Sequence, residues 1–231
     1  NNNPLQENSL NTNSSKNNMY SFFGYADIMP INDLKITLNG TLTSYDSRGT
    51  DATQPFYGYS RTAYPTGFVS RSSDQTYSYN FQQLVNYHHD FGHHHMEILL
   101  GHEFYRSRYE NLFGTKTGMA SYFTNQTLAG AIKLDKTGES GNSAYESEGF
   151  FGRGQYDYDQ KYFGSISYRR DASSRFDPDH RWGNFYSLGG AWIITKEKFM
   201  KSLRWLNMFK LKASFGQQGN DNIGDFHYRS E

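Results

Sequence analysis

Strict alternation of side-chain character is the feature that most constrains how this chain can fold. The clearest case is the segment 34–43, in which aliphatic Leu34, Ile36, Leu38 and Leu42 alternate with polar Lys35, Thr37, Asn39, Thr41 and Thr43. Successive side chains of a β-strand point to opposite faces, so this pattern predicts a strand with one apolar and one polar face. Its length of about ten residues suits one tilted strand that crosses a membrane.

A second alternating region, 162–192, consists of two strand-like segments around a polar loop. Before the loop, Tyr162, Gly164, Ile166 and Tyr168 share a face, and after it the same holds for Tyr186, Leu188, Gly190, Trp192 and Ile194. Aromatic residues near the ends with small or apolar residues between them are typical of a membrane barrel, whose outer face meets lipid. A soluble antiparallel sheet with one wet face is the alternative.

Composition favours the barrel and excludes several other classes. Aromatic residues make up 17% of the 231 residues, yet only 35% are hydrophobic, and the mean hydropathy is −0.83. Strands with one aromatic face and one polar face have this composition. The 23 basic and 23 acidic residues balance, which argues against a nucleic-acid partner. The absence of cysteine removes disulfides, thiol nucleophiles and thiolate metal sites, and no cofactor is expected.

The chain order predicts eight strands joined by connections that alternate between short and long. Short turns are expected near residues 30, 92, 159 and 200, and long loops at 46–74, 111–143 and 171–183. Residues 1–18 are predicted to be a loop, a short helix is expected within 119–132, and a helical turn within 196–201. Periplasmic turns opposite longer extracellular loops are typical of outer-membrane barrels. The predicted fold is therefore all-β, an antiparallel up-and-down meander.

The second half of the chain carries a family resemblance. The run 162–171 continues into Ser173-Ser174-Arg175-Phe176; Phe185, Ser187 and Trp192 precede Glu197-Lys198-Phe199; and Gly216 precedes Gly219-Asn220 and Ile223. Between about 145 and 225, this pattern resembles the barrel of TonB-linked outer-membrane proteins of the SusC/RagA family. The remainder of the sequence is compatible with such a barrel.

The resemblance implies a bacterial outer-membrane importer rather than an enzyme. Family members are similar in having a barrel of about 22 strands, closed by an N-terminal plug. They couple to TonB, pair with a SusD-like surface lipoprotein and take up oligosaccharides or peptides. Residues 1–231 are accordingly expected to be a single segment of the barrel domain, an open sheet surrounded by outer-membrane lipid. The plug and the TonB-contacting region are expected elsewhere in a longer protein. A secreted or surface β-rich carbohydrate-binding module without transport is the alternative.

Two groups of residues are candidates for binding or loop structure. Aromatic side chains in the first long connection could stack on sugar rings or peptide side chains, or could simply pack within the loop: Phe56, Tyr57, Tyr59 and Tyr64. Charged residues around the third long connection are expected to form a self-paired loop network rather than an anion site: Arg169, Arg170, Asp171, Arg175, Asp177, Asp179 and Arg181.

Two further clusters raise the possibility of metal binding, and neither is expected to hold a metal. Imidazoles gather around one turn, at His88, His89, His93, His94 and His95. Neighbours on a strand point to opposite faces, so a wet turn is the preferred interpretation. Asp221, Asn222 and Asp225 could offer oxygen ligands to calcium, but they lack the glutamate that ends an EF-hand loop. No motif for catalysis is present.

Overall fold

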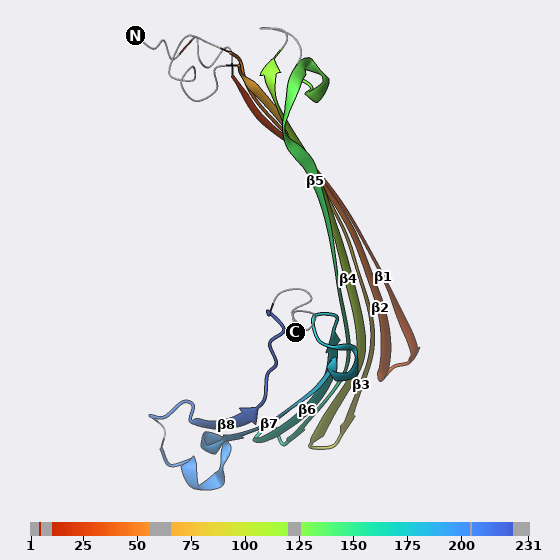
Figure 1. Ribbon diagram of the computed structural model, residues 1–231. Coiled ribbons are helices and arrows are strands. Elements are labelled where there is room, and N and C mark those ends of the chain that lie inside the picture. Colours follow the sequence, from red (N-terminus) through yellow and green to blue (C-terminus); the bar gives the residue numbers. More distant parts are fainter. Residues whose placement is uncertain (1–4, 6–10, 56–65, 120–125, 204, 224–231) are drawn as a thin grey trace. The chain divides into compact units, whose positions relative to one another are not determined.

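The computed structural model describes residues 5, 11–55, 66–119, 126–203 and 205–223, with the side chains of 134–137 left aside. Eight strands form one sheet (Figure 1). They are β1 (Thr12–Ile31), β2 (Leu34–Thr53), β3 (Phe68–Phe91), β4 (His94–Met119), β5 (Ala131–Tyr158), β6 (Tyr162–Ser173), β7 (Trp182–Ile193) and β8 (Lys210–Gly216). Short 3-10 turns are η1 (Leu128–Gly130), η2 (Pro178–His180), η3 (Ile194–Lys196) and η4 (Lys198–Met200). Across these described residues, no helix is long and apolar enough to span a membrane.

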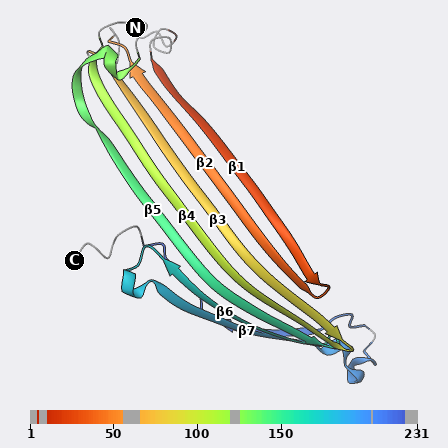
Figure 2. The ribbon, with the colours of Figure 1, turned by 90° about the vertical axis from the view of Figure 1, so that its right-hand side faces the viewer.

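The strands follow one another in the sheet in the order of the sequence. The order runs from β1 at one edge to β8 at the other, and Figure 2 shows β1 to β5 lying side by side. The last four strands pair in antiparallel registers, as in the pairing of Ile166 with Leu188 and of Leu188 with Phe215. The predicted up-and-down meander is confirmed, and so is the open sheet, since the first and last strands do not pair with each other in the described part.

The strands extend much further than the sequence pattern predicts. The expected loop 46–74 is wrong in large part, because β2 continues to Thr53 and β3 begins at Phe68. The expected loop 111–143 is likewise largely strand, from β4 and β5. Of the helix expected within 119–132, the described residues show only the 3-10 turn η1. The first strand also begins at Thr12, inside the expected loop 1–18. Backbone pairing between neighbours satisfies these polar segments without any apolar alternation.

The chain forms two compact units. The loop-end unit comprises residues 1–22, 42–78 and 107–144, and the membrane unit comprises residues 23–41, 79–106 and 145–231. The loop-end unit has its own small core of Ala52, Val69, Met119 and Ala131, against which Leu128 packs. Val69 is fully buried. The extended hairpin ends are thus held together by a few apolar side chains as well as by strand pairing.

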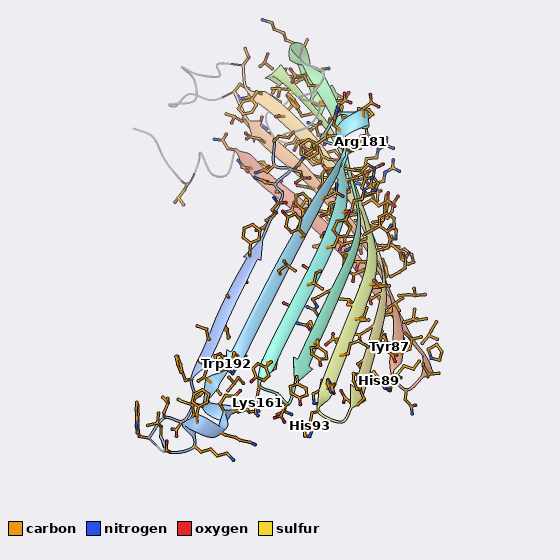
Figure 3. The ribbon with its side chains drawn as sticks, turned by 90° about the horizontal axis from the view of Figure 1, so that it is seen from below. Tyr87, His89, His93, Lys161, Arg181 and Trp192 are labelled. Carbon is orange, nitrogen blue, oxygen red and sulfur yellow. The ribbon has the colours of Figure 1, made fainter. Side chains whose placement is uncertain are left out.

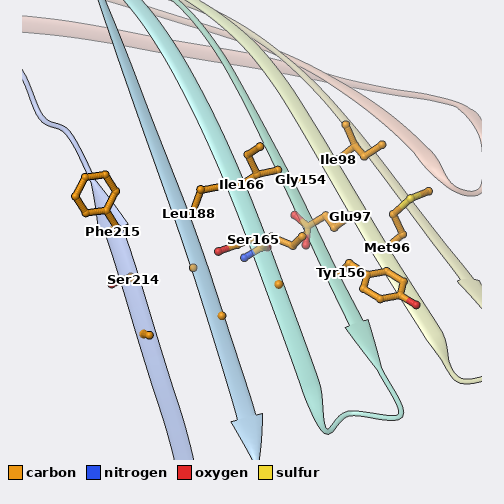
Figure 4. A pocket seen from close by; sticks show the side chains of 15 residues that line it. Met96, Glu97, Ile98, Gly154, Tyr156, Ser165, Ile166, Leu188, Ser214 and Phe215 are labelled. Carbon is orange, nitrogen blue, oxygen red and sulfur yellow. The ribbon is translucent and has the colours of Figure 1, made fainter.

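The two faces of the membrane unit differ in chemistry. The face called here the outer face carries exposed aliphatic and aromatic side chains, and Figure 4 shows Ile98, Ile166, Leu188 and Phe215 on it. Glycines between this row and Tyr156 leave a shallow depression of about 730 Å³. The opposite face, called the inner face, carries the charged side chains described below. This division confirms what the alternation predicts.

Aromatic rings form a belt on the outer face beside the short turns. Neighbouring ring centroids lie between 4.7 and 6.4 Å apart along most of the belt, which runs from β3 to β7 (Figure 3) and consists of Tyr87, His89, Phe91, His94, Tyr158, Tyr162 and Trp192. Glu197, in the connection after β7, accepts hydrogen bonds from the Tyr162 hydroxyl and, at 3.2 Å, from Trp192 Nε1. Those two bonds lower the pKa of Glu197. Such belts mark a membrane–water boundary.

A second set of aromatic residues lies near the opposite ends of β5 to β7. The rings of Phe150 and Trp182 stack with centroids 6.1 Å apart, and the Arg170 guanidinium lies 5.0 Å above the Trp182 ring. The Tyr168 hydroxyl donates to Asn184 at 2.7 Å. From Phe150 to Tyr158, β5 extends for about 26 Å at the usual rise of a strand. Tilted by about 40°, that length rises about 20 Å and so covers most of the apolar band of an outer-membrane barrel, which is about 25 Å tall.

The two faces should tolerate a buried charge very differently. Ile166 lies mid-band on the outer face with 59% of its surface exposed, so Ile166→Arg would place a guanidinium in lipid and should cost about 2–4 kcal/mol of unfolding free energy. Ser165→Arg is the matched control, because Ser165 is adjacent to Ile166 in the sequence and points to the opposite face. Denaturant unfolding of the protein in lipid bilayers measures the cost of each substitution, and equal costs would contradict the assignment of the faces.

Candidate ligand site on the inner face

A ladder of polar side chains crosses the inner face. Asn39 Nδ2 donates to Gln82 Oε1 at 3.2 Å, and Gln82 Nε2 donates to Glu103 at 3.4 Å. Arg169 lies 4.0 Å from Glu103, and its Nε donates to both carboxylate oxygens of Asp171 at 2.7 Å. The ladder therefore joins strands β2, β3, β4 and β6 by contacts between side chains of both charges. A face of this kind suits a water-filled lumen.

A second polar group lies nearer the short turns. Asn86 Nδ2 donates to Glu97 Oε1 at 3.1 Å, and Arg153 approaches the same oxygen at 3.5 Å. Further along the face, Asp27 accepts from Thr37 at 2.6 Å and pairs with Lys35 at 3.0 Å. The inner face thus stays polar from the turns up to the end of β6 and the start of β7, as the alternation predicts for the polar side chains of Lys35, Thr37 and Asn39.

A recess of the inner face lies where β6 ends and β7 begins. It has a volume of about 830 Å³, and its walls include Glu103, Arg169 and Asp171 from the ladder, Phe185 of β7, and Asp221 from the chain after β8. We call it the lumenal pocket. Its size falls in the usual range for small-molecule sites. Charged groups of both signs line it, so it offers both donors and acceptors to a polar ligand.

The Asp221 carboxylate fixes one wall of the lumenal pocket. It accepts hydrogen bonds from the Tyr145 hydroxyl at 2.6 Å and the Ser173 hydroxyl at 2.9 Å, and Arg175 Nη1 lies 3.8 Å from its Oδ1. The Arg175 guanidinium also lies 4.6 Å above the Tyr145 ring. The hydrogen bond from Tyr145 lowers the pKa of Asp221, followed by the bond from Ser173 and the positive charge of Arg175. These contacts tie the segment after β8 to β5 and β6.

A ring against two glycines holds the same segment to β7. The Phe185 ring occupies the space beside Gly183 and Gly219, and a Cβ built on Gly183 would lie 2.8 Å from Cζ of that ring. A Cβ on Gly219 would overlap the ring. The backbone N–H of Gln217 donates to the Tyr186 carbonyl at 2.9 Å nearby. Glycine at 219 is therefore required for this close approach.

The seven charged residues expected to form one loop network lie in four places. Arg169 and Asp171 pair on the inner face, whereas Arg170 points to the outer face and stacks on Trp182. Arg175 contacts Tyr145 and the Asp221 carbonyl, the latter at 3.2 Å. The rest belong to the turn η2: Asp177 accepts from the Asp179 backbone at 2.9 Å, and Arg181 Nε donates to the Phe176 carbonyl at 3.3 Å.

The remaining candidates give no common site. The ligand-stacking residues Phe56, Tyr57, Tyr59 and Tyr64 lie outside the described residues. The imidazoles have separate partners: His89 with Asp33 at 2.6 Å, His93 with Asp159 at 3.2 Å and His95 with Asp90 at 2.7 Å. His94 belongs to the aromatic belt. Asp225 also lies outside the described part, and within that part no group of three or more His, Asp or Glu side chains could hold a metal.

The sequence interpretation missed Tyr145, Phe185 and Glu103 as pocket residues and considered Asp221 only as a calcium ligand. Tyr145 and Asp221 are 76 positions apart, so no local spacing links them. The one usable signal was the pair of glycines Gly216 and Gly219 after a strand, because glycine there indicates a close approach of the backbone to another group.

Lowering the pH should release the segment after β8. The lowered pKa of Asp221 means that its stabilising contribution is complete above the ordinary aspartate pKa of about 3.9 and is lost as the pH falls through the lower folded-state value. A spin label on Cys at position 218 should therefore become more mobile below about pH 4. Asp221→Asn should make the label mobile at every pH, whereas Asp179→Asn should leave the transition unchanged. A label with equal mobility at all pH values in the unaltered protein would contradict this role.

Filling the space beside Phe185 should displace the segment after β8 even while Asp221 stays ionised. Gly219→Ala introduces a methyl group that overlaps the ring, and overpacking of this kind costs about 1–3 kcal/mol. The label at position 218 should show higher mobility at neutral pH, and adding Phe185→Leu should restore part of the order. Gly164→Ala is the control, because a Cβ there meets nothing within 4 Å.

Comparison with known proteins finds similarity to TonB-dependent receptors. No family model matches the sequence. The chain is 51% identical over 71 residues to the TonB-dependent receptor P39 of Formosa agariphila, covering 31% of the chain and 7% of that protein. It is 29% identical over 234 residues to the TonB-dependent receptor SusC of Bacteroides thetaiotaomicron, covering 96% of the chain and 22% of SusC. The chain thus spans less than a quarter of the length of these relatives.

The fold matches a solved transporter over nearly the whole chain. The structure of the RagAB peptide transporter superimposes with a TM-score of 0.86 and 26% identity, covering 94% of this chain and 24% of that one. The match includes the membrane unit that carries the lumenal pocket and the loop-end hairpins. The barrel wall expected from the sequence is therefore confirmed.

Proposed function

Because this chain belongs to the SusC/RagA family of TonB-dependent receptors of the bacterial outer membrane, we propose that it forms part of the wall of a nutrient importer and contributes to substrate capture. The single observation that carries the proposal is the polar inner face, which leads from the turns to the lumenal pocket of about 830 Å³. An outer face suited to lipid and an inner face suited to water are what a wall around a transport path requires.

The lumenal pocket is the proposed contact with substrate. Arg169 and Asp171 hold each other in place, and Asp221 and Arg175 do the same on the facing wall. Paired groups still have free donor and acceptor positions, so they can bind hydroxyl or amide groups without presenting a net charge. This favours oligosaccharides or peptides, the classes that the family resemblance implies. The Tyr-rich stretch 56–64 is proposed as a further contact by ring stacking.

The complete receptor is proposed to work with partners that contact other parts of it. A SusD-like surface lipoprotein would deliver substrate at the loop end, and TonB would act through an N-terminal region that drives movement of the plug. RagAB is a peptide transporter, and SusC is a TonB-dependent receptor. These relatives support the class of function proposed for the parent protein.

Two neighbouring arginines provide a test of the pocket. Arg169 points into the lumenal pocket, and Arg170 points to the outer face and stacks on Trp182. Arg169→Gln should lower the affinity of the complete receptor and its lipoprotein for substrate about ten-fold, since a charge-assisted hydrogen bond contributes about 1.5–3 kcal/mol. Arg170→Gln should change it less than two-fold.

The measurement uses two probe pools, a fluorescent oligosaccharide pool from a starch digest and a fluorescent peptide pool from a casein digest. Binding is measured on the purified complex and uptake in cells that express it. Loss of binding in Arg169→Gln alone supports the pocket. Equal effects of both variants would reject the pocket as the contact, and failure of the unaltered receptor to take up either pool would reject these substrate classes.

A further inference from the structure

Four basic side chains come together in the loop-end unit. Lys16 of β1, Arg48 of β2, Arg71 of β3 and Lys116 of β4 line a pocket of about 660 Å³, and none of the lining residues that the structure describes is acidic. The whole chain has 23 basic and 23 acidic residues, so this concentration of one sign is local. We call it the basic pocket.

The register of the sheet shows that these cations lie on one face. Side-chain bonds join Asn39 to Gln82, Asp46 to Gln75 and Thr50 to Arg71, and in each pair the two residue numbers have the same sum. The pairing of β2 with β3 therefore keeps a single register, and alternation along β2 is unbroken. Arg48 and Thr50 accordingly lie on the same side of β2 as Leu38, which is the outer side. The basic pocket is thus distinct from the lumenal pocket.

The cations of the basic pocket are not neutralised by neighbouring acids. In the part of the chain that the structure describes, no ion pair joins any of the four to a carboxylate. Acidic side chains of the same unit have other partners: Asp46 accepts from Gln75 at 2.7 Å, Asp74 accepts from the Tyr109 hydroxyl at 2.7 Å, and Glu110 pairs with Arg108 at 2.6 Å. Like charges held close together repel, and a bound anion would relieve that repulsion.

The other groups in the pocket suit a sugar that carries an oxoanion. Arg71 is oriented by its bond to Thr50, and an arginine fork matches the geometry of phosphate or sulfate oxygens. The hydroxyls of Ser14, Thr50 and Ser73 line the pocket on the side of the cations, and Leu112 and Leu128 add apolar surface. Gly114 keeps the floor open, because a Cβ there would lie 3.2 Å from Leu128 Cδ1. Cations, hydroxyls and an apolar wall together can hold both the charged group and the ring.

We propose that the basic pocket binds a phosphate- or sulfate-bearing sugar, independently of the substrate that passes through the lumen. This chemistry has two sources at a bacterial surface: phosphorylated glycolipid of the outer leaflet and soluble sulfated glycan. In either case the arginines bind the oxoanion and the hydroxyls bind the ring.

The test uses the complete receptor in lipid nanodiscs with two matched pairs of probes. One pair is a sulfated chondroitin tetrasaccharide and its desulfated form, added in solution. The other is phosphorylated lipid A and its dephosphorylated form, incorporated in the nanodisc and detected by native mass spectrometry. At least one charged probe should bind more than ten-fold more tightly than its uncharged counterpart, and its affinity should fall as salt is raised. Binding of the sulfated tetrasaccharide would identify a soluble glycan as the ligand, and binding of phosphorylated lipid A would identify the glycolipid.

Substitutions assign the binding to the pocket. Combined Arg48→Gln and Arg71→Gln should weaken the charged probe about a hundred-fold, or about ten-fold for each lost charge-assisted bond. Combined Arg48→Lys and Arg71→Lys keeps the charge and should retain much of the affinity, which excludes misfolding as the cause. Arg108→Gln is the control, because Arg108 pairs with Glu110 outside the pocket. No preference for either charged probe, or unchanged binding in the double glutamine variant, would overturn the proposal.

Discussion

The need to satisfy every backbone N–H and C=O laterally governs this structure. In lipid no water can bond these groups, so the strands must pair edge to edge with their neighbours. The pairing fixes an alternation of side chains, and the membrane gives the two faces different solvents. Ile166 of β6 can face lipid because its neighbours Ser165 and Ser167 face the lumen, and Leu188 of β7 pairs with Ile166 on the outer face. Polar side chains of the inner face are thereby confined to every second residue.

The same constraint determines where a ligand site can form. Within the membrane unit the inner face is a regular ladder, and its side chains largely satisfy one another. The pattern changes where β6 ends and β7 begins, because the segment after β8 returns over the inner face and is held by Asp221 and by the Phe185 ring against Gly219. A recess arises there because strand ends and a returning segment cannot pack as regularly as strands do.

The sequence predicts this fold where the two faces meet different solvents and fails where both meet water. The alternation of 34–43 and 162–192 identified the strands and their faces correctly, since lipid demands apolar residues. In 46–53 and 68–74, serine, threonine and aspartate predominate, and the period disappears although the strands continue. Alternation along the strand would have been enough to predict that Arg169 and Asp171 share one face and that Arg170 lies on the other. The bond between Tyr145 and Asp221 could not be predicted, because it depends on a return path far along the chain.

Charge balance separates the two pockets by the ligands they can accept. In the lumenal pocket Arg169 is paired with Asp171, so an anion that binds Arg169 would have to displace an existing pair. A neutral or zwitterionic ligand bears no such cost, which suits a path that a substrate must also leave. In the basic pocket, Arg48 and Arg71 have no carboxylate partner among the described residues, and an anion would gain attraction without breaking a pair. Such a site favours retention of a bound anion.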